Sequence, residues 1–306
     1  MPTKSKSEEV ILSIVTPAFN EEKNLPLLYV RLKKSLDQLG VSWEWVVVDD
    51  HSVDGTYKTL EKLATKDKRV RGIRFTKNLG SHLALVCGFK AARGRSAVCM
   101  AADLQDPPEL IGQLVSKWKE GYQIVWAVRA KREGESFGTQ FFSRLYYFIV
   151  RYVVGFKQIP PAGADFLLLD RLVLNTLAKA KIRNASLFLL ISSFPFKQGF
   201  INYVKQERAY GQSGWSFKKK LKLFFDSITM FSKAPIYWTL GMGMVCLAGA
   251  LVFFSRDIVT QGSFYLGMFF VLAVFFMIGV GAALLRRLDE TLQTETAAYV
   301  IEKRTN

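Results

Sequence analysis

Two long uncharged runs near the C-terminal end constrain this chain more than any other feature. Residues 236–254 read IYWTLGMGMVCLAGALVFF, and residues 263–285 read SFYLGMFFVLAVFFMIGVGAALL. A helix needs roughly 20 apolar residues to cross a bilayer, and both runs meet that requirement. Uncharged runs of this length are rare in soluble domains, which disfavours the alternative of two buried core helices. We therefore predict two transmembrane helices within 236–285, joined by the short linker SRDIVTQG.

Basic residues around this hairpin predict its orientation. The segment FKKKLK precedes the first run, Arg286 and Arg287 follow the second, and the linker contains one Arg and one Asp. The positive-inside rule then places both ends of the hairpin in the cytoplasm. The polar start MPTKSKSEEV predicts no cleaved signal peptide. We therefore predict a multi-pass protein of the cell inner (plasma) membrane, with residues before 235 and a C-terminal tail at 286–306 on the cytoplasmic side.

The net charge of +16 predicts a polyanionic partner, which is nucleic acid, anionic lipid or a phosphorylated substrate. No nucleic-acid-binding motif accompanies the charge, so we expect no nucleic acid partner. Residues 211–235 include SFKKKLKLFFDSITMFSK, in which lysines stand beside apolar side chains. Such a segment is typical of an amphipathic helix that lies in the bilayer interface and attracts anionic lipids. The basic aromatic stretch 141–156 fits either the membrane surface or core packing.

The first 210 residues alternate between strand and helix patterns. Apolar runs predict strands at 10–19, 43–50, 70–75, 96–103 and 122–131, and helical periodicity predicts helices at 20–40, 52–67, 80–94 and 107–121. This order is typical of an α/β fold whose mostly parallel sheet is covered on both faces. We therefore predict one α/β domain at 1–210.

Polar side chains gather at the predicted carboxyl ends of these strands, where ligands bind in such sheets. They are Asn20, Glu21, Asp49, Asp50, Asp103, Gln105 and Arg129. For each acid the alternative is an ordinary role in a turn or helix cap. The chain contains no G-x-x-x-x-G-K-[ST] loop, so we expect a metal and basic side chains to hold any phosphate groups.

Four segments carry a resemblance to a known family. They are SIVTPAFNEE, VVVDDHSVDGT, ADLQDPPEL and ERAYGQSGWSFKKKLKLFFDSI. Followed by two membrane spans, they resemble glycosyltransferase family 2 across residues 10–290. The closest branch looks like the polyprenyl-phosphate glycosyltransferases, which include dolichol-phosphate mannose synthase and the GtrB-type enzymes. The resemblance implies a Rossmann-like GT-A catalytic domain and inverting transfer of a sugar from a nucleotide-diphosphate sugar to a polyprenyl phosphate.

The resemblance also implies a nucleotide-sugar site. The family's P-x-Y-x-E stretch lines the nucleoside pocket and falls here on Pro17, Phe19 and Glu21. The second acid of the VDD strand end, Asp50, would hold the base or ribose, with Val48 beside it. The D-x-D-x-Q element, which binds the metal and the diphosphate, reads Ala101, Ala102, Asp103, Leu104, Gln105.

The first acid of that element is missing, because Ala101 stands in its place. Mg²⁺ keeps several waters and takes one or two carboxylates together with substrate phosphates. We therefore expect Mg²⁺ or Mn²⁺ to bind Asp103 and Gln105, at a site that Ala101 weakens without removing. An inactive homologue is the alternative that Ala101 leaves open.

The implied acceptor is a polyprenyl phosphate such as undecaprenyl phosphate, whose phosphate oxygen is already an anion and needs no strong general base. Guanidinium groups fit phosphate oxygens, so arginines are candidates for contact with the phosphate groups. For some of these arginines the alternative is an ordinary solvated side chain. The candidate phosphate and acceptor residues are Arg129, Arg132, Arg144, Arg208 and Ser213. Asp165, in AGADFLLLD, resembles the acid of the family's G-D-F segment and would orient the sugar or acceptor. The alternative is that Asp165 caps the start of a helix. The candidate catalytic set is Asp103, Asp165, Arg129 and Arg208.

Other functions remain as alternatives to transfer of a sugar to a polyprenyl phosphate. A processive polysaccharide synthase would carry a Q-x-x-R-W motif and more spans, and this chain has no Arg-Trp pair. A catalytically silent adaptor that binds nucleotide sugar or lipid is supported by Ala101, and transfer to another acceptor is a further alternative. Several hexoses fit the motifs alike, and family analogy alone favours a uridine nucleotide. Residues 297–303, AAYVIEK, alternate weakly and suggest an edge strand added to a neighbouring subunit of a homo-oligomer.

Overall fold

The computed structural model describes residues 11–129, 148, 165–180, 187–206, 210, 234–255, 261–293 and 301–305. Within the two long C-terminal helices it describes the side chains of 237–249 and 267–286. Four of the predicted site residues lie outside these ranges: Arg132, Arg144, Arg208 and Ser213. The predicted interfacial segments 141–156 and 211–233 lie outside them as well, apart from residue 148.

An eight-stranded sheet, with the strand order β7-β5-β6-β4-β1-β2-β3-β8, forms the centre of the described chain. Most neighbouring strands are parallel, while β6 is antiparallel to β4 and β5, and β8 is antiparallel to β3. The strands are β1 (Leu12–Ala18), β2 (Trp43–Asp49), β3 (Val70–Phe75), β4 (Ser96–Cys99), β5 (Ile124–Arg129), β6 (Phe166–Asp170), β7 (Gln198–Tyr203) and β8 (Ile301–Arg304). The predicted α/β class with a largely parallel sheet is therefore confirmed.

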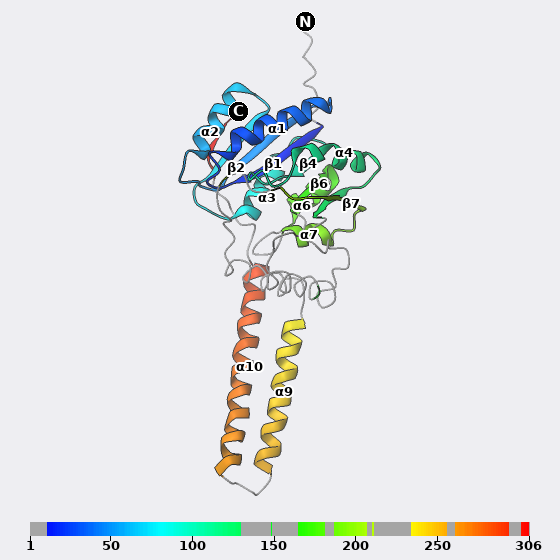
Figure 1. Cartoon of the computed structure of the whole chain (residues 1–306). Coiled ribbons are helices and arrows are strands. Elements are labelled where there is room, and N and C mark those ends of the chain that lie inside the picture. Colours follow the sequence, from blue (N-terminus) through cyan, green and yellow to red (C-terminus); the bar gives the residue numbers. More distant parts are fainter. Residues whose placement is uncertain are drawn as a thin grey trace.

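Helices cover both faces of the sheet (Figure 1). One core joins the sheet to α1 (Asn24–Gln38), α2 (Thr56–Lys66) and α4 (Ile111–Lys119). The other joins it to α3 (Ser81–Ala91), α6 (Arg171–Lys179) and α7 (Leu187–Ser193). Side chains of a strand alternate between its faces, so β2 sends Trp45 and Val47 into the first core and Val46 and Val48 into the second.

The sequence of α1 shows why it packs where it does. Its fully buried leucines, at positions 25, 28, 32 and 36, recur at the spacing of one helical face. The chain then turns through Gly40, whose φ of 63° lies in the left-handed region that glycine adopts most readily. The turn leads the chain from the end of α1 into β2.

The C-terminal half contains the two predicted apolar helices, α9 (Ala234–Ser255) and α10 (Gln261–Gln293). Figure 1 shows them side by side, extending away from the sheet. Within the described residues, one helix is long and apolar enough to cross a membrane, at Gly267–Arg286, and none of that segment is buried inside the chain. The described apolar part of α9, Tyr237–Gly249, is shorter. An added Cβ at Gly249 would lie 3.1 Å from the Phe270 ring, so this glycine permits close contact between the two helices.

The strand near the C-terminus exists and extends the sheet of its own chain, because β8 lies antiparallel to β3. The homo-oligomer stays a prediction. The Gly72 amide donates to Thr305 Oγ1 at 2.7 Å, and the Thr305 amide donates to the Gly72 carbonyl at 2.9 Å. The physical reason is that β3 offers a free sheet edge, which the chain fills after α10.

Candidate active site

The carboxyl ends of the strands bring most of the predicted site residues to one edge of the sheet. The turn after β1 contains Asn20, whose φ of 58° is left-handed. Its amide donates to Ser52 Oγ at 2.9 Å, and its side-chain oxygen accepts from the Val53 amide at 3.0 Å. These bonds join the loop after β1 to the loop after β2. The Glu21 carboxylate accepts from Asn24 Nδ2 at 2.6 Å, so Glu21 is fixed at the start of α1.

The two acids that end β2 are buried and bind protein groups. Asp49 accepts from the Ser52 amide and from Arg74 Nη1, each at 3.0 Å. The Asp50 carboxylate accepts from the Leu79 amide at 2.6 Å and the Gly80 amide at 2.7 Å. Burial raises the pKa of Asp50 even though these two donors oppose the shift. Each carboxylate oxygen has a further lone pair, so these bonds leave Asp50 able to accept from a nucleoside hydroxyl.

The remaining predicted nucleoside residues differ in accessibility. Pro17 and Val48 are register partners across β1 and β2. The Val48 side chain is fully buried in the core between the sheet and α3, so it has no surface to offer a ligand. Phe19, by contrast, is 44% exposed beside the end of β1. Of these three residues, Phe19 has the side chain best placed to contact a base.

The candidate metal loop follows β4. The strand ends at Cys99, four residues before the predicted limit, and Leu104 in the loop has a left-handed φ of 63°. The Gln105 amide donates to Asp103 Oδ1 at 3.2 Å, and Gln105 Nε2 donates to the Gln206 carbonyl at 3.3 Å. The second bond uses the nitrogen end of the Gln105 amide, so its oxygen is the end suited to a cation. Ala101 is half-buried and supplies no acid.

Asp106 is a site residue that the sequence reasoning missed, although it stands in the same motif. It is 1% exposed and accepts from the Tyr203 hydroxyl at 2.6 Å. Its other oxygen, Oδ2, is buried without a hydrogen-bond partner. Burial, followed by the charge of Asp165, raises the pKa of Asp106 to about 6. Its place directly after the predicted metal residues is the signal that pointed to it.

Arg129 and Asp165 form an ion pair at the same edge. Arg129 Nη2 donates to both Asp165 oxygens, at 2.8 and 2.9 Å. The antiparallel direction of β6 explains the meeting, because the start of β6 lies beside the end of β5, with Phe166 opposite Ala127. Burial raises the pKa of Asp165, but the charges of Arg129 and Lys205 outweigh it, and the pKa lies below its usual range. Lys205, whose Nζ lies 3.9 Å from Asp165, is a second residue that the sequence reasoning missed.

The described residues contain no group of three His, Cys, Asp or Glu side chains arranged to hold a metal ion. The donors that are present still fit a hard cation that keeps several waters: the carboxylate of Asp103 and the amide oxygen of Gln105. Beside them lies the buried, unpartnered Oδ2 of Asp106, which is an orphaned acceptor of the kind that a metal-bound water satisfies. The residues therefore fit Mg²⁺ or Mn²⁺.

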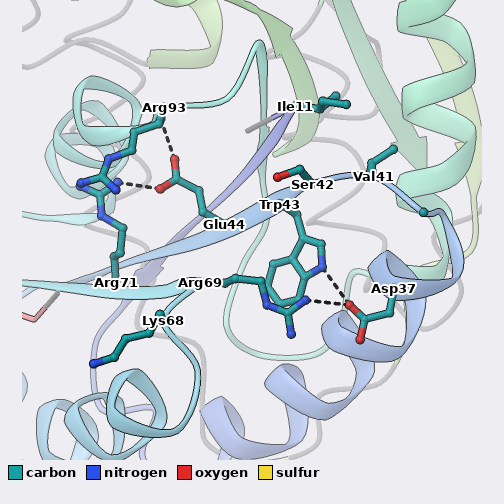
Figure 2. A pocket seen from close by; sticks show the side chains of 11 residues that line it. Ile11, Asp37, Val41, Ser42, Trp43, Glu44, Lys68, Arg69, Arg71 and Arg93 are labelled. Atoms are coloured by element: carbon teal, nitrogen blue, oxygen red, sulfur yellow. Dashed lines mark hydrogen bonds and ion pairs between the residues drawn. The ribbon is translucent and has the colours of Figure 1, made fainter. Parts of the chain in front are cut away.

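A cavity of about 870 Å³ lies at the opposite edge, near the amino ends of β2 and β3 (Figure 2). It is lined by charged residues that bind one another. Arg69 Nη1 donates to Asp37 Oδ1 at 2.8 Å, and Arg71 Nη1 donates to Glu44 Oε2 at 2.7 Å. In parallel sheets ligands bind at the carboxyl ends, which is the edge away from this cavity. The candidate site is therefore the edge of Asp103, Asp106, Arg129 and Asp165.

Known proteins that are similar to this chain identify its family. A family model described as glycosyl transferase family 2 matches residues 13–177. The chain belongs to glycosyl transferase family 2. It is 39% identical over 230 residues to YkcC of Bacillus subtilis, which is named as an uncharacterized glycosyltransferase, covering 75% of this chain and 71% of that one. It is 30% identical over 310 residues to an undecaprenyl-phosphate 4-deoxy-4-formamido-L-arabinose transferase of Pectobacterium atrosepticum, covering 95% of this chain and 93% of that one.

A solved structure shares the fold of this family 2 enzyme. It is glucosyl-3-phosphoglycerate synthase from Mycobacterium tuberculosis, in complex with Mn²⁺, uridine diphosphate and phosphoglyceric acid. The two align with a TM-score of 0.51 and 17% identity, covering 72% of this chain and 76% of the other. The predicted GT-A fold and glycosyltransferase activity are thus confirmed, and the relatives include transferases that act on undecaprenyl phosphate.

Proposed function

We propose that this family 2 enzyme transfers a sugar from a nucleotide-diphosphate sugar, of which a UDP-sugar is favoured, to a polyprenyl phosphate such as undecaprenyl phosphate. The observation that supports it most is the cluster of Asp103, Asp106, Asp165 and Arg129 at the carboxyl edge of a GT-A sheet. Relatives named as undecaprenyl-phosphate transferases, matched over most of the chain, support the acceptor. The Mn²⁺ and uridine diphosphate in the M. tuberculosis structure support the metal and the nucleotide.

The donor is held in two parts. Asp50, Glu21 and Phe19 bind the nucleoside at the ends of β1 and β2. Asp103 and Gln105 would hold Mg²⁺ or Mn²⁺, which would stabilise the negative charge on the departing diphosphate. Asp165 orients the sugar or the acceptor, and Arg129 keeps the Asp165 carboxylate ionised and in place. Domain 1–210 is the catalytic domain in this scheme.

The transfer follows from the charges of the reactants. An oxygen of the lipid phosphate attacks the anomeric carbon from the side opposite the diphosphate, so the new carbon–oxygen bond forms with inversion. The bond from that carbon to the diphosphate oxygen breaks, and its electron pair leaves on the nucleoside diphosphate. The attacking oxygen carries no proton at neutral pH, so positioning and electrostatics dominate over base catalysis. Lys205 and Arg129 lie where cations would hold two phosphate groups close together.

The membrane-facing parts complete the proposal. The apolar helix at Gly267–Arg286, together with α9, would anchor the enzyme as a hairpin in the inner membrane. Residues 211–235 would lie in the interface on the cytoplasmic side, where Arg208 and Ser213 would meet the lipid phosphate. Arg132 and Arg144 are further candidates for that contact.

The test is nucleoside diphosphate release by the detergent-purified chain, using a panel of UDP- and GDP-sugars with and without undecaprenyl phosphate. We expect release that needs both the lipid phosphate and Mg²⁺ or Mn²⁺, and that Asp103→Ala abolishes. Asp37→Ala, which alters the cavity of Figure 2, is the matched control and should keep turnover. Folded protein that releases nothing with any donor would contradict the proposal and favour the silent adaptor, for which Ala101 is the supporting residue. Lipid-independent release would indicate another acceptor.

A further inference from the structure

The segment that leaves β7, residues 203–206, lies directly against the candidate metal loop, residues 103–106. The Tyr203 hydroxyl donates to Asp106 Oδ1 at 2.6 Å. The Gln206 amide donates to the Gln105 carbonyl at 2.9 Å, and Gln105 Nε2 donates back to the Gln206 carbonyl at 3.3 Å. Three hydrogen bonds therefore join two segments that are about a hundred residues apart in sequence.

Tyr203 is itself firmly held. Its side chain is 4% exposed, and its ring meets that of Phe166 edge to face with 5.9 Å between the centroids. Across the sheet it is the register partner of Arg129. Burial raises the pKa of Tyr203, so the hydroxyl stays neutral and remains a hydrogen-bond donor at physiological pH. The donor to Asp106 is thus fixed by β5, β6 and β7 together.

Asp106 depends on this donor. It is buried, and among the described residues Tyr203 is the group that donates to its carboxylate, while Oδ2 has no hydrogen-bond partner. Removing the hydroxyl would leave a buried carboxylate with neither oxygen satisfied, which costs more than the bond itself contributes. The loop would relieve that cost by moving, and Asp103 and Gln105 would move with it.

The same segment leads toward the acceptor. Gln206 is anchored on its other side, since Arg31 Nη1 donates to Gln206 Oε1 at 3.1 Å while Arg31 also binds Glu109. Further along, the Tyr210 carbonyl accepts from Asn24 Nδ2 at 3.3 Å, close to Glu21. Gln206 therefore contacts the candidate metal loop, and Tyr210 contacts Asn24 beside the proposed nucleoside residue Glu21. In the sequence, these two residues flank the proposed acceptor residue Arg208.

We propose that Tyr203 is a positioning residue, which acts through Asp106 to hold the loop 103–106 in the arrangement that receives the metal and the diphosphate. The hydrogen bond thereby couples the segment that leads to the acceptor site to the donor site. This inference rests on the proposed function, since it assigns a role within the same site.

The test is Tyr203→Phe in the full-length protein in detergent, because this change removes the hydroxyl and keeps the ring. Tyr29→Phe is the matched control, since the Tyr29 hydroxyl donates to Asp67 at 2.9 Å at the other edge of the sheet. Calorimetry would measure binding of UDP in the presence of Mn²⁺, and kinetics would measure the Mn²⁺ concentration for half-maximal turnover. We expect Tyr203→Phe to weaken Mn²⁺-dependent UDP binding about tenfold and to raise the half-maximal Mn²⁺ concentration similarly, with Tyr29→Phe unchanged in both.

A double-mutant cycle tests the route through Asp106. Asp106→Ala should show a defect at least as large, and adding Tyr203→Phe to it should have little further effect. Additive defects, or a Tyr203→Phe enzyme that binds Mn²⁺ and UDP as the wild type does, would overturn the inference, even if that variant is less stable. A wild-type protein that neither binds Mn²⁺ and UDP nor turns over would instead refute the proposed function.

Discussion

The acidic side chains at the two edges of the sheet differ in their partners and in their pKa values. At the amino edge, around the cavity of Figure 2, each acid meets a base. A hydrogen bond from Lys33 helps to lower the pKa of Asp37 to about 2, and Arg69 lowers the pKa of Asp67 to about 2. Arg69 also lies 4.0 Å above the Trp43 ring. The charges at this edge stabilise the fold.

At the carboxyl edge two buried acids bind neutral donors: Asp50 accepts from two backbone amides, and Asp106 accepts from the Tyr203 hydroxyl. Burial raises the pKa values of Asp50 and Asp106, in opposition to the shifts at the other edge. Asp49 and Asp165 are different, because Arg74 binds Asp49 and Arg129 binds both oxygens of Asp165. A buried acid that lacks enough hydrogen-bond donors or bases around it lowers the stability of the fold. Such acids gather at functional sites, where a ligand or cation supplies the missing charge. The raised pKa values of Asp50 and Asp106 therefore mark these two acids of the carboxyl edge as candidates for ligand contact, whereas the lowered pKa values of Asp37 and Asp67 belong to ion pairs that stabilise the fold.

The largest expected difference between the edges comes from removing one arginine at each. Arg129→Ala removes the two hydrogen bonds that hold Asp165 and should lower turnover by about 100-fold or more, a typical loss for a preorganised charged group in an active site. Arg69→Ala should keep turnover close to the wild-type value and lower the thermal unfolding midpoint, because Arg69 binds Asp37 and Asp67. Lipid-dependent release of nucleoside diphosphate and thermal unfolding, measured on the same samples, check both. Equal losses of turnover would remove the distinction between the edges.

The next effect concerns the acid that the metal loop lacks. Ala101→Asp would add a carboxylate two residues before Asp103, and a second carboxylate strengthens the binding of a hard cation. We expect the Mn²⁺ concentration for half-maximal turnover to fall about tenfold, which corresponds to about 1.4 kcal/mol. Ala97→Ser, a change in the middle of β4, serves as a control for disturbance of that strand. An unchanged Mn²⁺ requirement would show that position 101 does not reach the metal.

A smaller effect follows from the lowered pKa of Asp67 at the structural edge. An unfolded Asp titrates near 3.9, so the folded form with a pKa of about 2 contributes stability above about pH 4, which is lost as the pH falls toward 2. Asp67 is 11% exposed in its side chain, so solvent screening is limited. Asp67→Asn should cost about 1–2 kcal/mol at pH 7, and its deficit in unfolding midpoint should shrink between pH 4 and pH 3. A deficit that stays constant over that range would mean that the carboxylate charge is not the cause.

Much of this architecture could be predicted from the sequence. Alternating apolar runs and helical periodicities gave the order β1 to β5, because the parallel strands are buried on both faces and contain few polar residues. The rule that ligands bind at the carboxyl ends of the strands then predicted Asp50, Asp103 and Arg129 at one edge of the sheet. Local pattern was sufficient for these residues because each stands at the end of its strand or within four residues of it.

The rest depends on contacts between distant segments. The antiparallel direction of β6 places Asp165 against Arg129, and the position of β7 brings Tyr203 and Lys205 to the site. Neither direction nor position in a sheet can be read from a single run such as FLLLD. For Val48 the family motif predicted a binding residue, but the motif could not show that the Val48 side chain is buried in the core.

The smallest expected effect concerns β8, which joins the C-terminal end to the nucleotide side of the working edge. Arg74 binds Glu302 at 3.2 Å and also binds Asp49 at 3.0 Å, so Arg74 links the strand to the last residue of β2. Glu302 is 38% exposed, and exposed ion pairs contribute about 0–1 kcal/mol. Glu302→Gln should therefore change the KM for the nucleotide sugar by less than about twofold, since Arg74 keeps its buried bond to Asp49. A KM several-fold higher, with an unchanged unfolding midpoint, would show that β8 acts on the nucleoside site and that the working edge extends to the C-terminal strand.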